Sequence, residues 1–357
     1  MPDATATAQH ASAMWMRGGT SKGLFFEGRD VPSAIADRNA FLLRVMGSPD
    51  ARQIDGVGGG HPLTSKVAIV SPSALEGVDV DYEFLQVGVE QAVVSGAQTC
   101  GNILAGVAPF AVERGLVQPQ GDQTTVSIHL VNTGDIARAT FMTPDQQVTY
   151  EGTFGLEGVP GTGNPIELEV SPREAPLFVT GKVSEAINAI TVSLVNNGMP
   201  VAIVSARELG ISGQETVEQL ESMPELLGLI EELRIEAGVR MGLGDVTSLT
   251  VPKMLVVSPP SQGADVAVRA LIPHRVHRSI GVLMAAGLAA SARVEGSVAA
   301  VAAGGRIGSD DRAITIEHPS GVLAVDASAW KDERGEWRAN SRSVRTARKL
   351  FDGVVYA

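Results

Sequence analysis

Two long apolar stretches stand out in a chain whose other segments mostly alternate between hydrophobic and polar residues. Residues 103–112 and 280–292 would be apolar on nearly every face of a helix, and a helix that is apolar all round is buried. Segments such as residues 126–131 alternate with a period of two, which predicts antiparallel strands. The pattern therefore predicts two central helices, each wrapped by a curved sheet.

The order of these elements repeats in the second half of the chain. A glycine turn within residues 14–23 precedes a strand that carries Lys66, and the first apolar helix follows. A turn within residues 192–200 precedes a strand that carries Lys253, and the second apolar helix follows. This self-similarity favours two homologous halves over a short-repeat solenoid. We expect an α+β fold with domains 1–181 and 182–357, whose final strand packs back on the first domain.

Smaller signals refine this outline. Leucines spaced between charges over residues 215–240 predict a helical insertion on the surface, broken near Pro224. Gly115 and Gly296 lie where the two apolar helices are expected to stop. Thr99 is the expected N-cap of the first apolar helix.

Charge and cysteine content narrow the class of function. The chain has 28 Lys and Arg against 40 Asp and Glu, a net charge of −12, which disfavours nucleic-acid and anionic-membrane partners. One cysteine excludes an intramolecular disulfide, the first residues lack an apolar signal core, and residues 279–292 are too short to span a bilayer. We expect a cytoplasmic protein with a small-molecule ligand, and neither a monomer nor a homodimer is excluded.

Cys100 stands at the start of the first apolar helix. The positive end of a helix dipole stabilises a thiolate, and such a helix start also binds anions through its backbone N–H groups. Gly101 leaves the backbone open to a ligand and Asn102 adds an amide. A lone cysteine is more often an inert buried residue, but this setting favours proton exchange at Cys100.

Lys66 lies in an otherwise apolar strand. A single lysine there would usually extend its amine to a sheet edge. The preceding glycine run, residues 56–60, lets a ligand approach the backbone and favours the other outcome, a desolvated Lys66. Desolvation lowers the pKa of a lysine and makes it a usable general base.

Neither glycine region matches a nucleotide site. A phosphate loop places its lysine between Gly and Ser or Thr, whereas Lys22 and Lys66 both follow a serine. His274 and His277 are three residues apart, but no third metal ligand is evident. We therefore expect neither a metal nor a cofactor.

Basic and hydroxyl side chains recur at the glycine turns and helix starts. In an acidic protein such clusters suit carboxylates, which Arg binds through two parallel hydrogen bonds. These residues predict a site for a small polycarboxylate. The candidate binding residues are Arg17, Thr20, Ser21, Lys22, Thr64, Ser65, Gly101, Asn102, His274, Arg275, Arg278, Ser279 and Ser320.

Ten stretches spread over the whole chain form a specific set: residues 16–23, 46–56, 63–68, 100–106, 158–163, 197–200, 244–246, 272–275, 318–321 and 344–348. Together they resemble the family of 2-methylaconitate isomerases and 4-oxalomesaconate isomerases and tautomerases. The resemblance implies a diaminopimelate-epimerase-like fold with Lys66 and Cys100 as the catalytic pair. The true epimerases use two cysteines, one from each half, whereas this chain has Ser279 near the second helix start, which argues against racemisation.

Within that family the chain looks most like the oxalomesaconate isomerases of lignin-derived aromatic catabolism. The resemblance implies a cofactor-independent 1,3-allylic proton shift that converts 4-oxalomesaconate to 2-keto-4-carboxy-3-hexenedioate in protocatechuate 4,5-cleavage. Lys66 is assigned as the base and Cys100 as the proton donor, and the reverse assignment stays open. The alternatives are 2-methylaconitate cis–trans isomerisation, keto–enol tautomerisation of oxalomesaconate, and a non-catalytic carboxylate-binding protein.

Overall fold

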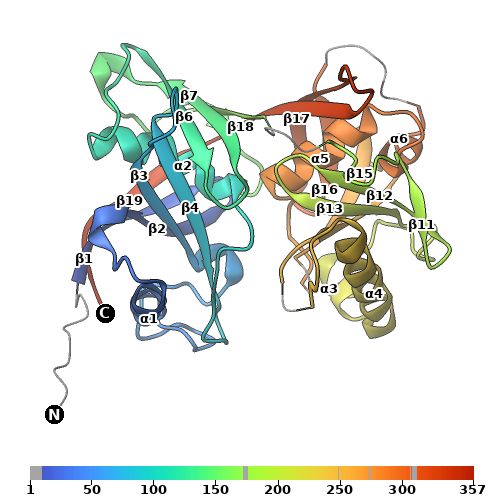
Figure 1. Cartoon of the computed structure of the whole chain (residues 1–357), viewed down its shortest axis with the longest axis horizontal. Helices are drawn as coiled ribbons and strands as arrows, with labels where there is room; N and C mark the ends of the chain where they lie inside the picture. Colours follow the sequence, from blue (N-terminus) through green and yellow to red (C-terminus); the bar gives the residue numbers. More distant parts are fainter. Residues whose placement is uncertain (1–9, 172–175, 248, 273–274, 306, 308–311) are drawn as a thin grey trace. The chain divides into compact units, whose positions relative to one another are not determined.

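The chain forms two compact units, each built on its own sheet and helices (Figure 1). The computed structural model describes residues 10–171, 176–247, 249–272, 275–305, 307 and 312–357. Unit 1 comprises Met1–Leu168 and Val344–Ala357, and unit 2 comprises Glu169–Ser343. The contacts thus separate the units at Leu168, whereas the sequence analysis placed the boundary near residue 181.

Unit 1 contains one mixed, mostly antiparallel sheet. β1 and β2 form an antiparallel hairpin, β2 and β3 pair in parallel, and β3 and β4 are antiparallel. β4 and β6 are parallel, and β6 and β7 antiparallel. The strands of this sheet include β1 (His10–Gly18), β2 (Ser21–Glu27), β3 (Lys66–Pro72), β4 (Val80–Val87), β5 (Val94–Ser95), β6 (Gln123–Leu130), β7 (Asp135–Met142) and β19 (Ala347–Tyr356). β8 (Phe154–Gly155) and β9 (Thr162–Gly163) pair antiparallel in a separate two-stranded sheet.

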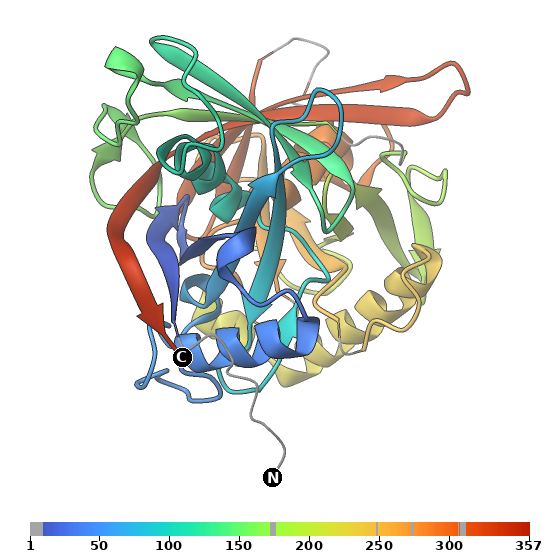
Figure 2. The same ribbon diagram turned by 60° about the vertical axis from the view of Figure 1, so that its left-hand side comes forward.

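The C-terminal strand completes this sheet. β19 pairs antiparallel with β1, from Gly18 opposite Ala347 to His10 opposite Tyr356. Figure 2 shows β19 running beside β1 at one edge of the unit. The chain therefore returns to unit 1 after leaving unit 2, and its last residues hold the strand that leads to the first glycine turn.

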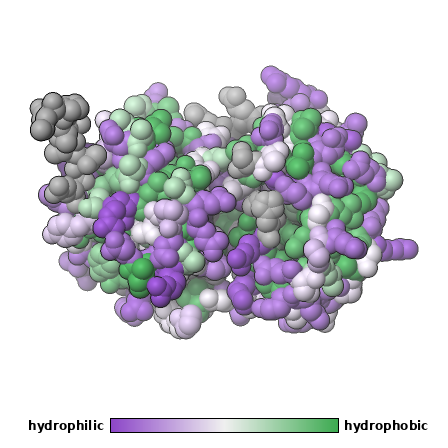
Figure 3. Space-filling model, turned by 90° about the horizontal axis from the view of Figure 1, so that it is seen from below, coloured by the Kyte–Doolittle hydropathy of each residue, from purple (hydrophilic) through white to green (hydrophobic). Residues whose placement is uncertain are grey.

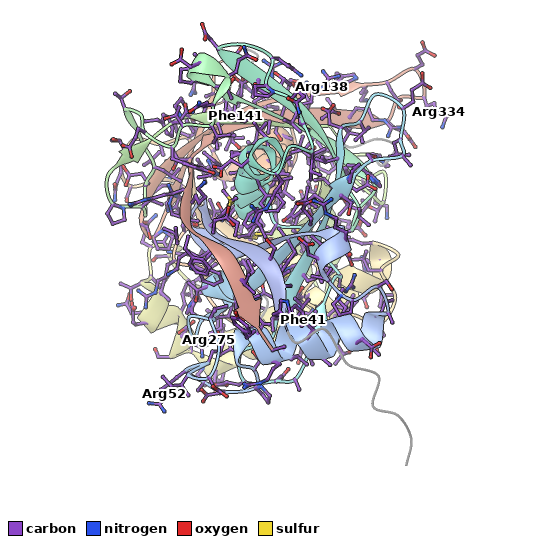
Figure 4. The ribbon with its side chains drawn as sticks, turned by 90° about the vertical axis from the view of Figure 1, so that its left-hand side faces the viewer. Phe41, Arg52, Arg138, Phe141, Arg275 and Arg334 are labelled. Atoms are coloured by element: carbon purple, nitrogen blue, oxygen red, sulfur yellow. The ribbon has the colours of Figure 1, made fainter. Side chains whose placement is uncertain are left out.

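The helix α2 (Gly101–Glu113) lies at the centre of unit 1, and its residues up to Ala111 are buried. Figure 4 views this helix end-on among the strands of the unit. On β7, Phe141 is buried while Arg138 is exposed, as the period-two pattern requires. Gly106 allows close packing, because an added Cβ would lie 2.6 Å from Cζ of Phe25.

Unit 2 repeats the pairing scheme of unit 1. β12 and β13 are antiparallel, β13 and β14 parallel, β14 and β15 antiparallel, β15 and β16 parallel, and β16 and β17 antiparallel. The predicted duplication is confirmed by this match. The strands include β11 (Glu185–Ile187), β12 (Ile190–Asn196), β13 (Pro200–Ser205), β14 (Lys253–Ser258), β15 (Val266–Leu271), β16 (Ile314–His318) and β17 (Gly321–Lys331).

Two further strands connect the units along the chain. β10 (Ile166–Ser171) contains the break after Leu168, and β18 (Trp337–Arg345) contains the break after Ser343. β18 pairs antiparallel with β17. Arg345 is therefore the last residue of a strand that begins in unit 2 and ends in unit 1.

The helices of unit 2 follow the predicted pattern. α5 (Val282–Ala292) is buried along its whole length. The insertion forms α3 (Val217–Glu221) and α4 (Pro224–Arg240), so the predicted break at Pro224 is confirmed. α6 (Val298–Ala302) follows α5, with Gly296 in the left-handed region between them (φ +83°).

Two features of unit 1 differ from or extend the prediction. α1 (Ile35–Met46) was not singled out in the sequence; it buries Phe41 and Met46 on one face (Figure 4). α2 ends before Gly115, whose φ of +70° matches the predicted stop. The N-cap of α2 is Cys100 and not Thr99, which is buried.

The surface mixes polar and apolar side chains. Figure 3 shows hydrophilic residues interspersed with hydrophobic ones over the face seen from below. Over the described part of the chain, no helix is both long enough and apolar enough to pass through a bilayer.

Candidate functional site

Lys66 is a buried lysine at the first position of β3. The residue is only 6% exposed. Its Nζ donates to Oε1 of Gln86 at 2.7 Å and lies 5.1 Å from the centre of the Phe84 ring. Burial lowers the pKa of Lys66, and the charge of a Cys100 thiolate opposes that shift. The expected desolvated lysine is therefore present, close enough to Cys100 to respond to its charge.

Gln86 fixes the direction of the Lys66 amine. Nε2 of Gln86 donates to the carbonyl oxygens of Ser65 (2.8 Å) and Pro62 (3.1 Å). Because these carbonyls can only accept, the amide nitrogen must face them and Oε1 must face Lys66. β3 and β4 pair Lys66 directly with Gln86, so the two side chains meet across the ladder.

Cys100 precedes α2 in an extended conformation. Its side chain makes no capping hydrogen bond, so the thiol is not committed to the helix. The Tyr82 hydroxyl donates to the Cys100 carbonyl oxygen at 3.2 Å. Burial, and then the charge of Cys100, raise the pKa of Tyr82, so its phenol stays protonated and keeps this bond.

The first turn of α2 presents unused backbone donors. Within the described residues, the N–H groups of Gly101, Asn102 and Ile103 donate to no acceptor, and Leu104 is the first to bond back, to Cys100. All three residues are buried. A helix start of this kind attracts negative charge through its N–H groups and its dipole. The predicted anion site at Gly101 and Asn102 thus has donors next to the Cys100 thiol.

The turn between β1 and β2 packs directly on this helix start. Gly19 has a left-handed φ of +52°, and an added Cβ there would collide with the Asn102 side chain. The Asn102 amide donates to Oγ1 of Thr20 at 3.2 Å and accepts from the Thr20 N–H at 3.4 Å. The glycine turn and the Cys100 helix start are therefore one structural unit.

Two hydroxyls of this turn remain able to donate. Thr20 Oγ1 accepts from Asn102, which leaves its own proton for another acceptor. Ser21 is 1% exposed, and its Oγ has no hydrogen-bond partner in the described residues. An unsatisfied buried hydroxyl is costly, so a ligand acceptor at Ser21 would relieve that cost.

The hydroxyls of Ser65 and Thr64 donate to backbone carbonyls. Ser65 Oγ donates to the Val87 carbonyl at 2.9 Å and accepts from Nε2 of Gln53 at 2.7 Å. Since a serine has a single O–H, Ser65 has no proton left to give a carboxylate. Thr64 Oγ1 donates to the His61 carbonyl at 3.1 Å.

Arg17 donates hydrogen bonds to nearby backbone carbonyls. Its Nη1 donates to the carbonyl oxygens of Gly19 and Thr346, each at 2.9 Å. Burial, and then the charge of Arg348, lower the pKa of Arg17. Lys22, its register partner on β2, is half-buried.

The remaining candidates belong to unit 2. Arg275 is exposed, and Arg278 is an exposed partner of Glu218, with Nη2 3.3 Å from Oε1. Ser279 Oγ lies 3.4 Å from Nε2 of His318. Ser320 Oγ donates to the Arg278 carbonyl. His274 lies outside the described residues.

Two buried amides of the site were missed by the sequence analysis. Gln86 orients Lys66, and Gln53 is 1% exposed, bonds Ser48, Ser65 and the Gly60 N–H, and has a φ of +46°. Their partners are distant in sequence, so no local motif marks them. In the part of the chain that the structure describes, no cluster of three His, Cys, Asp or Glu side chains is placed to hold a metal ion.

Comparison with known proteins relates nearly the whole chain to one family. The PrpF protein family model matches residues 8–357. The chain is 48% identical over 364 residues to a (4E)-oxalomesaconate Delta-isomerase of Novosphingobium, covering 100% of both chains. It is 46% identical over 344 residues to a 4-oxalomesaconate tautomerase of Pseudomonas putida, covering 95% of this chain and 94% of the other.

Solved structures agree with the architecture. A methylitaconate-delta-isomerase superposes with a TM-score of 0.78 at 31% identity, covering 98% of this chain and 95% of the other. A hydroxyproline epimerase from Agrobacterium vitis gives a TM-score of 0.57 at 15% identity, covering 98% and 93%. The second likeness concerns the fold alone, and it confirms the predicted epimerase-like architecture.

Proposed function

The chain belongs to the PrpF protein family, and on that premise we propose that it is an isomerase that moves a proton along 4-oxalomesaconate, giving 2-keto-4-carboxy-3-hexenedioate. The observation that carries this assignment is the Lys66 amine, which is buried, held by Gln86 and sensitive to the charge of Cys100. A base and a thiol at one site suit an allylic proton shift. The relative named as an oxalomesaconate isomerase supports the choice of substrate.

The substrate supplies much of the reactivity. Its methylene group lies between a keto acid and a carboxylate-bearing double bond, so both groups acidify the same C–H. Removal of that proton gives a dienolate whose charge spreads over several oxygens. The protein must then supply a base, donors for the oxygens and an acid at the far allylic carbon.

Lys66 acts as the base. A neutral amine has a lone pair, and burial increases the neutral fraction because it lowers the pKa of Lys66. One N–H of the amine is occupied by Gln86. This hydrogen bond restricts rotation of the amine and so limits the directions that its lone pair can take, as a positioned general base requires.

Cys100 delivers a proton to the far carbon. The N–H groups at the start of α2, together with the Thr20 and Ser21 hydroxyls, are donors for the dienolate oxygens. After delivery, Lys66 is an ammonium and Cys100 a thiolate. The thiolate raises the pKa of Lys66, so this charge-separated state is stabilised until proton exchange restores the amine and thiol.

Two other reactions use the same groups. Another relative is named a 2-methyl-aconitate isomerase, 33% identical over 384 residues, and its substrate would need the same abstraction and delivery. Keto–enol tautomerisation of oxalomesaconate would stop after protonation on oxygen, as the name of the Pseudomonas relative suggests. The identities of 48% and 46% to the two oxalomesaconate enzymes, against 33% to the 2-methyl-aconitate isomerase, favour oxalomesaconate as the substrate.

Proton NMR in heavy water tests the proposal. Purified enzyme is offered 4-oxalomesaconate and 2-methylaconitate separately, and the expected result is turnover of the first with deuterium at the carbon that gains the proton. Faster turnover of 2-methylaconitate would reassign the substrate, and exchange without movement of the double bond would indicate the tautomerase. Binding of both acids without any turnover would indicate a carboxylate-binding protein.

Location and cofactor use follow from the same chemistry. A catalytic Cys100 must stay a free thiol, which the reducing cytoplasm maintains, so we place the enzyme there. The proposed steps use only Lys66 and Cys100, with backbone N–H groups and the Thr20 and Ser21 hydroxyls as donors, so dialysis against a strong chelator should leave turnover unchanged. A loss of activity that a divalent metal restores would contradict this.

A further inference from the structure

Arg345 is a buried arginine with no acidic partner among the residues that the structure describes. The residue is 3% exposed, and its one hydrogen bond in the described residues joins Nη1 to the carbonyl of the preceding residue, Val344, at 2.8 Å. Burial alone lowers the pKa of Arg345, to about 10. A buried cation that lacks a counter-charge is strongly unfavourable.

Other buried arginines in the chain are compensated. Arg234 is 0% exposed, but it pairs with Glu231 at 2.6 Å and donates to several backbone carbonyls. Arg269 is 5% exposed and donates to the Glu215 carbonyl at 2.8 Å; burial lowers the pKa of Arg269, but the charges of Glu317 and Glu215 oppose that shift. No carboxylate of the described residues pairs with Arg345, so its guanidinium retains donors for an anion.

The backbone ties Arg345 to the Cys100 helix start. The next residue, Thr346, accepts from the Gly19 N–H and from Arg17 Nη1, each at 2.9 Å. Gly19 in turn packs on Asn102, in the first turn of α2. β19 begins immediately afterwards, at Ala347 opposite Gly18. Arg345 therefore directly precedes the residue that anchors the turn of the candidate site.

We propose that Arg345 is a carboxylate subsite of this enzyme, binding one carboxylate of a tricarboxylate through its free guanidinium donors. The identity of the ligand class rests on the proposed function, since the substrate named there carries three carboxylates. A guanidinium binds a carboxylate with two parallel hydrogen bonds, and each charged hydrogen bond is stronger when water is excluded. The substrate would supply the counter-charge that the fold leaves out.

Calorimetric titration with tricarballylate, a saturated tricarboxylate that cannot isomerise, tests the subsite in the full-length protein. Arg345→Met should weaken tricarballylate binding by roughly 10- to 100-fold, while Arg345→Lys should recover part of the loss. Arg348→Met removes the same charge from an exposed neighbour and should change affinity little. Glutarate, a dicarboxylate, should distinguish the Arg345 variants less than tricarballylate does.

Thermal unfolding without ligand separates a binding role from a structural one. If Arg345 awaits a ligand, Arg345→Met should melt at the same or a higher temperature, because it removes an uncompensated buried charge. A lower melting temperature with unchanged tricarballylate affinity would overturn the proposal, as would unchanged affinity in a stable variant. If Arg345→Met fails to fold, an Arg345→Lys variant with wild-type affinity and specificity would overturn it as well.

These outcomes are distinguishable from failure of the proposed function. Tricarballylate binding that depends on Arg345, in an enzyme that turns over neither oxalomesaconate nor 2-methylaconitate, would retain the subsite and reject the reaction. Turnover of oxalomesaconate with an Arg345-independent KM would retain the reaction and reject the subsite.

Discussion

The two units share one strand order but differ in the chemistry at their helix starts. In unit 1, α2 follows Cys100, a thiol that makes no capping bond, and the adjoining strand begins with Lys66 bound to Gln86. In unit 2, the residues before α5 include Ser279, a hydroxyl next to His318. A thiol exchanges protons near neutral pH far more readily than a serine hydroxyl does. The duplicated backbone thus holds a proton-transfer site in one unit and a hydrogen-bonding site in the other.

The hydrogen bonds around His318 define what Ser279 can do. The Ser320 N–H donates to Nδ1 of His318 at 3.2 Å, so the proton of a neutral imidazole lies on Nε2. Nε2 faces Ser279 Oγ at 3.4 Å. In this tautomer the imidazole donates and Ser279 accepts, which leaves the serine proton for an acceptor such as a carboxylate. This arrangement suits binding and does not activate the serine as a base.

In each unit an asparagine amide donates a hydrogen bond between the turn and the central helix, but the asparagine belongs to the helix in unit 1 and to the turn in unit 2. In unit 1 the amide of Asn102 reaches from α2 to the turn at Thr20. In unit 2 the amide of Asn197 reaches from the turn to the Ala286 carbonyl on α5, at 3.2 Å. Both units therefore have this amide hydrogen bond, although Asn102 and Asn197 do not occupy equivalent positions. The two units thus agree in their strand pairing but differ in the side chains that join turn to helix.

The largest expected effect is loss of the proton-transfer pair of unit 1. Lys66→Met and Cys100→Ser should each lower kcat by roughly a hundredfold or more, because each removes a group that transfers a proton. Steady-state kinetics on folded protein measures this, with exposed Lys182→Met as the matched control. Near-wild-type turnover in either variant would show that this residue does not transfer a proton, and would contradict the assignment of the proton-transfer site to unit 1.

Substitution of Gln86 is expected to lower kcat less than loss of Lys66 or Cys100, and to change how activity depends on pH. Activity should rise with pH as Lys66 loses its proton, with an apparent pKa below that of an ordinary lysine because burial lowers it. Gln86→Glu places a negative charge beside Nζ, favours the ammonium and should move that rise to higher pH. Gln86→Leu removes the acceptor and should lower kcat by about tenfold.

The pH profile of kcat/KM decides whether Gln86 positions the base. Exposed Gln91→Leu serves as the control and should leave both the rate and the profile unchanged. A Gln86→Glu profile that coincides with wild type would show that Lys66 does not titrate in the active range.

Much of the fold was predictable because its signals are local. The all-apolar sequences of α2 and α5, the lysines that begin β3 and β14, and Pro224 at the start of α4 are each visible within a short window. The pair Lys66 and Cys100 was proposed from an unusual lysine and a helix start. Its catalytic role stays a prediction.

The missing parts depend on partners far apart in the chain. Gln86 reads as an ordinary polar position of a strand, and only the β3–β4 register places it opposite Lys66. Arg17 was proposed as a ligand-binding residue, and its binding role stays a prediction; that its Nη1 donates to the carbonyl of Thr346, 329 residues away, could not be predicted from a local motif. Arg345 is notable because it is buried and no acidic side chain of the described ranges pairs with it, which no sequence pattern can reveal.

The smallest expected effect tests the other side of the comparison. If Ser279 only donates a hydrogen bond to substrate, Ser279→Ala should raise KM by about two- to tenfold and leave kcat nearly unchanged, because a single neutral hydrogen bond contributes about 0.5–1.5 kcal/mol. Ser328→Ala, at an exposed position of β17, is the matched control. Steady-state kinetics separates the two constants. A fall in kcat comparable to that of Cys100→Ser would show that the second helix start takes part in proton transfer, and the division of labour between the units would then be wrong.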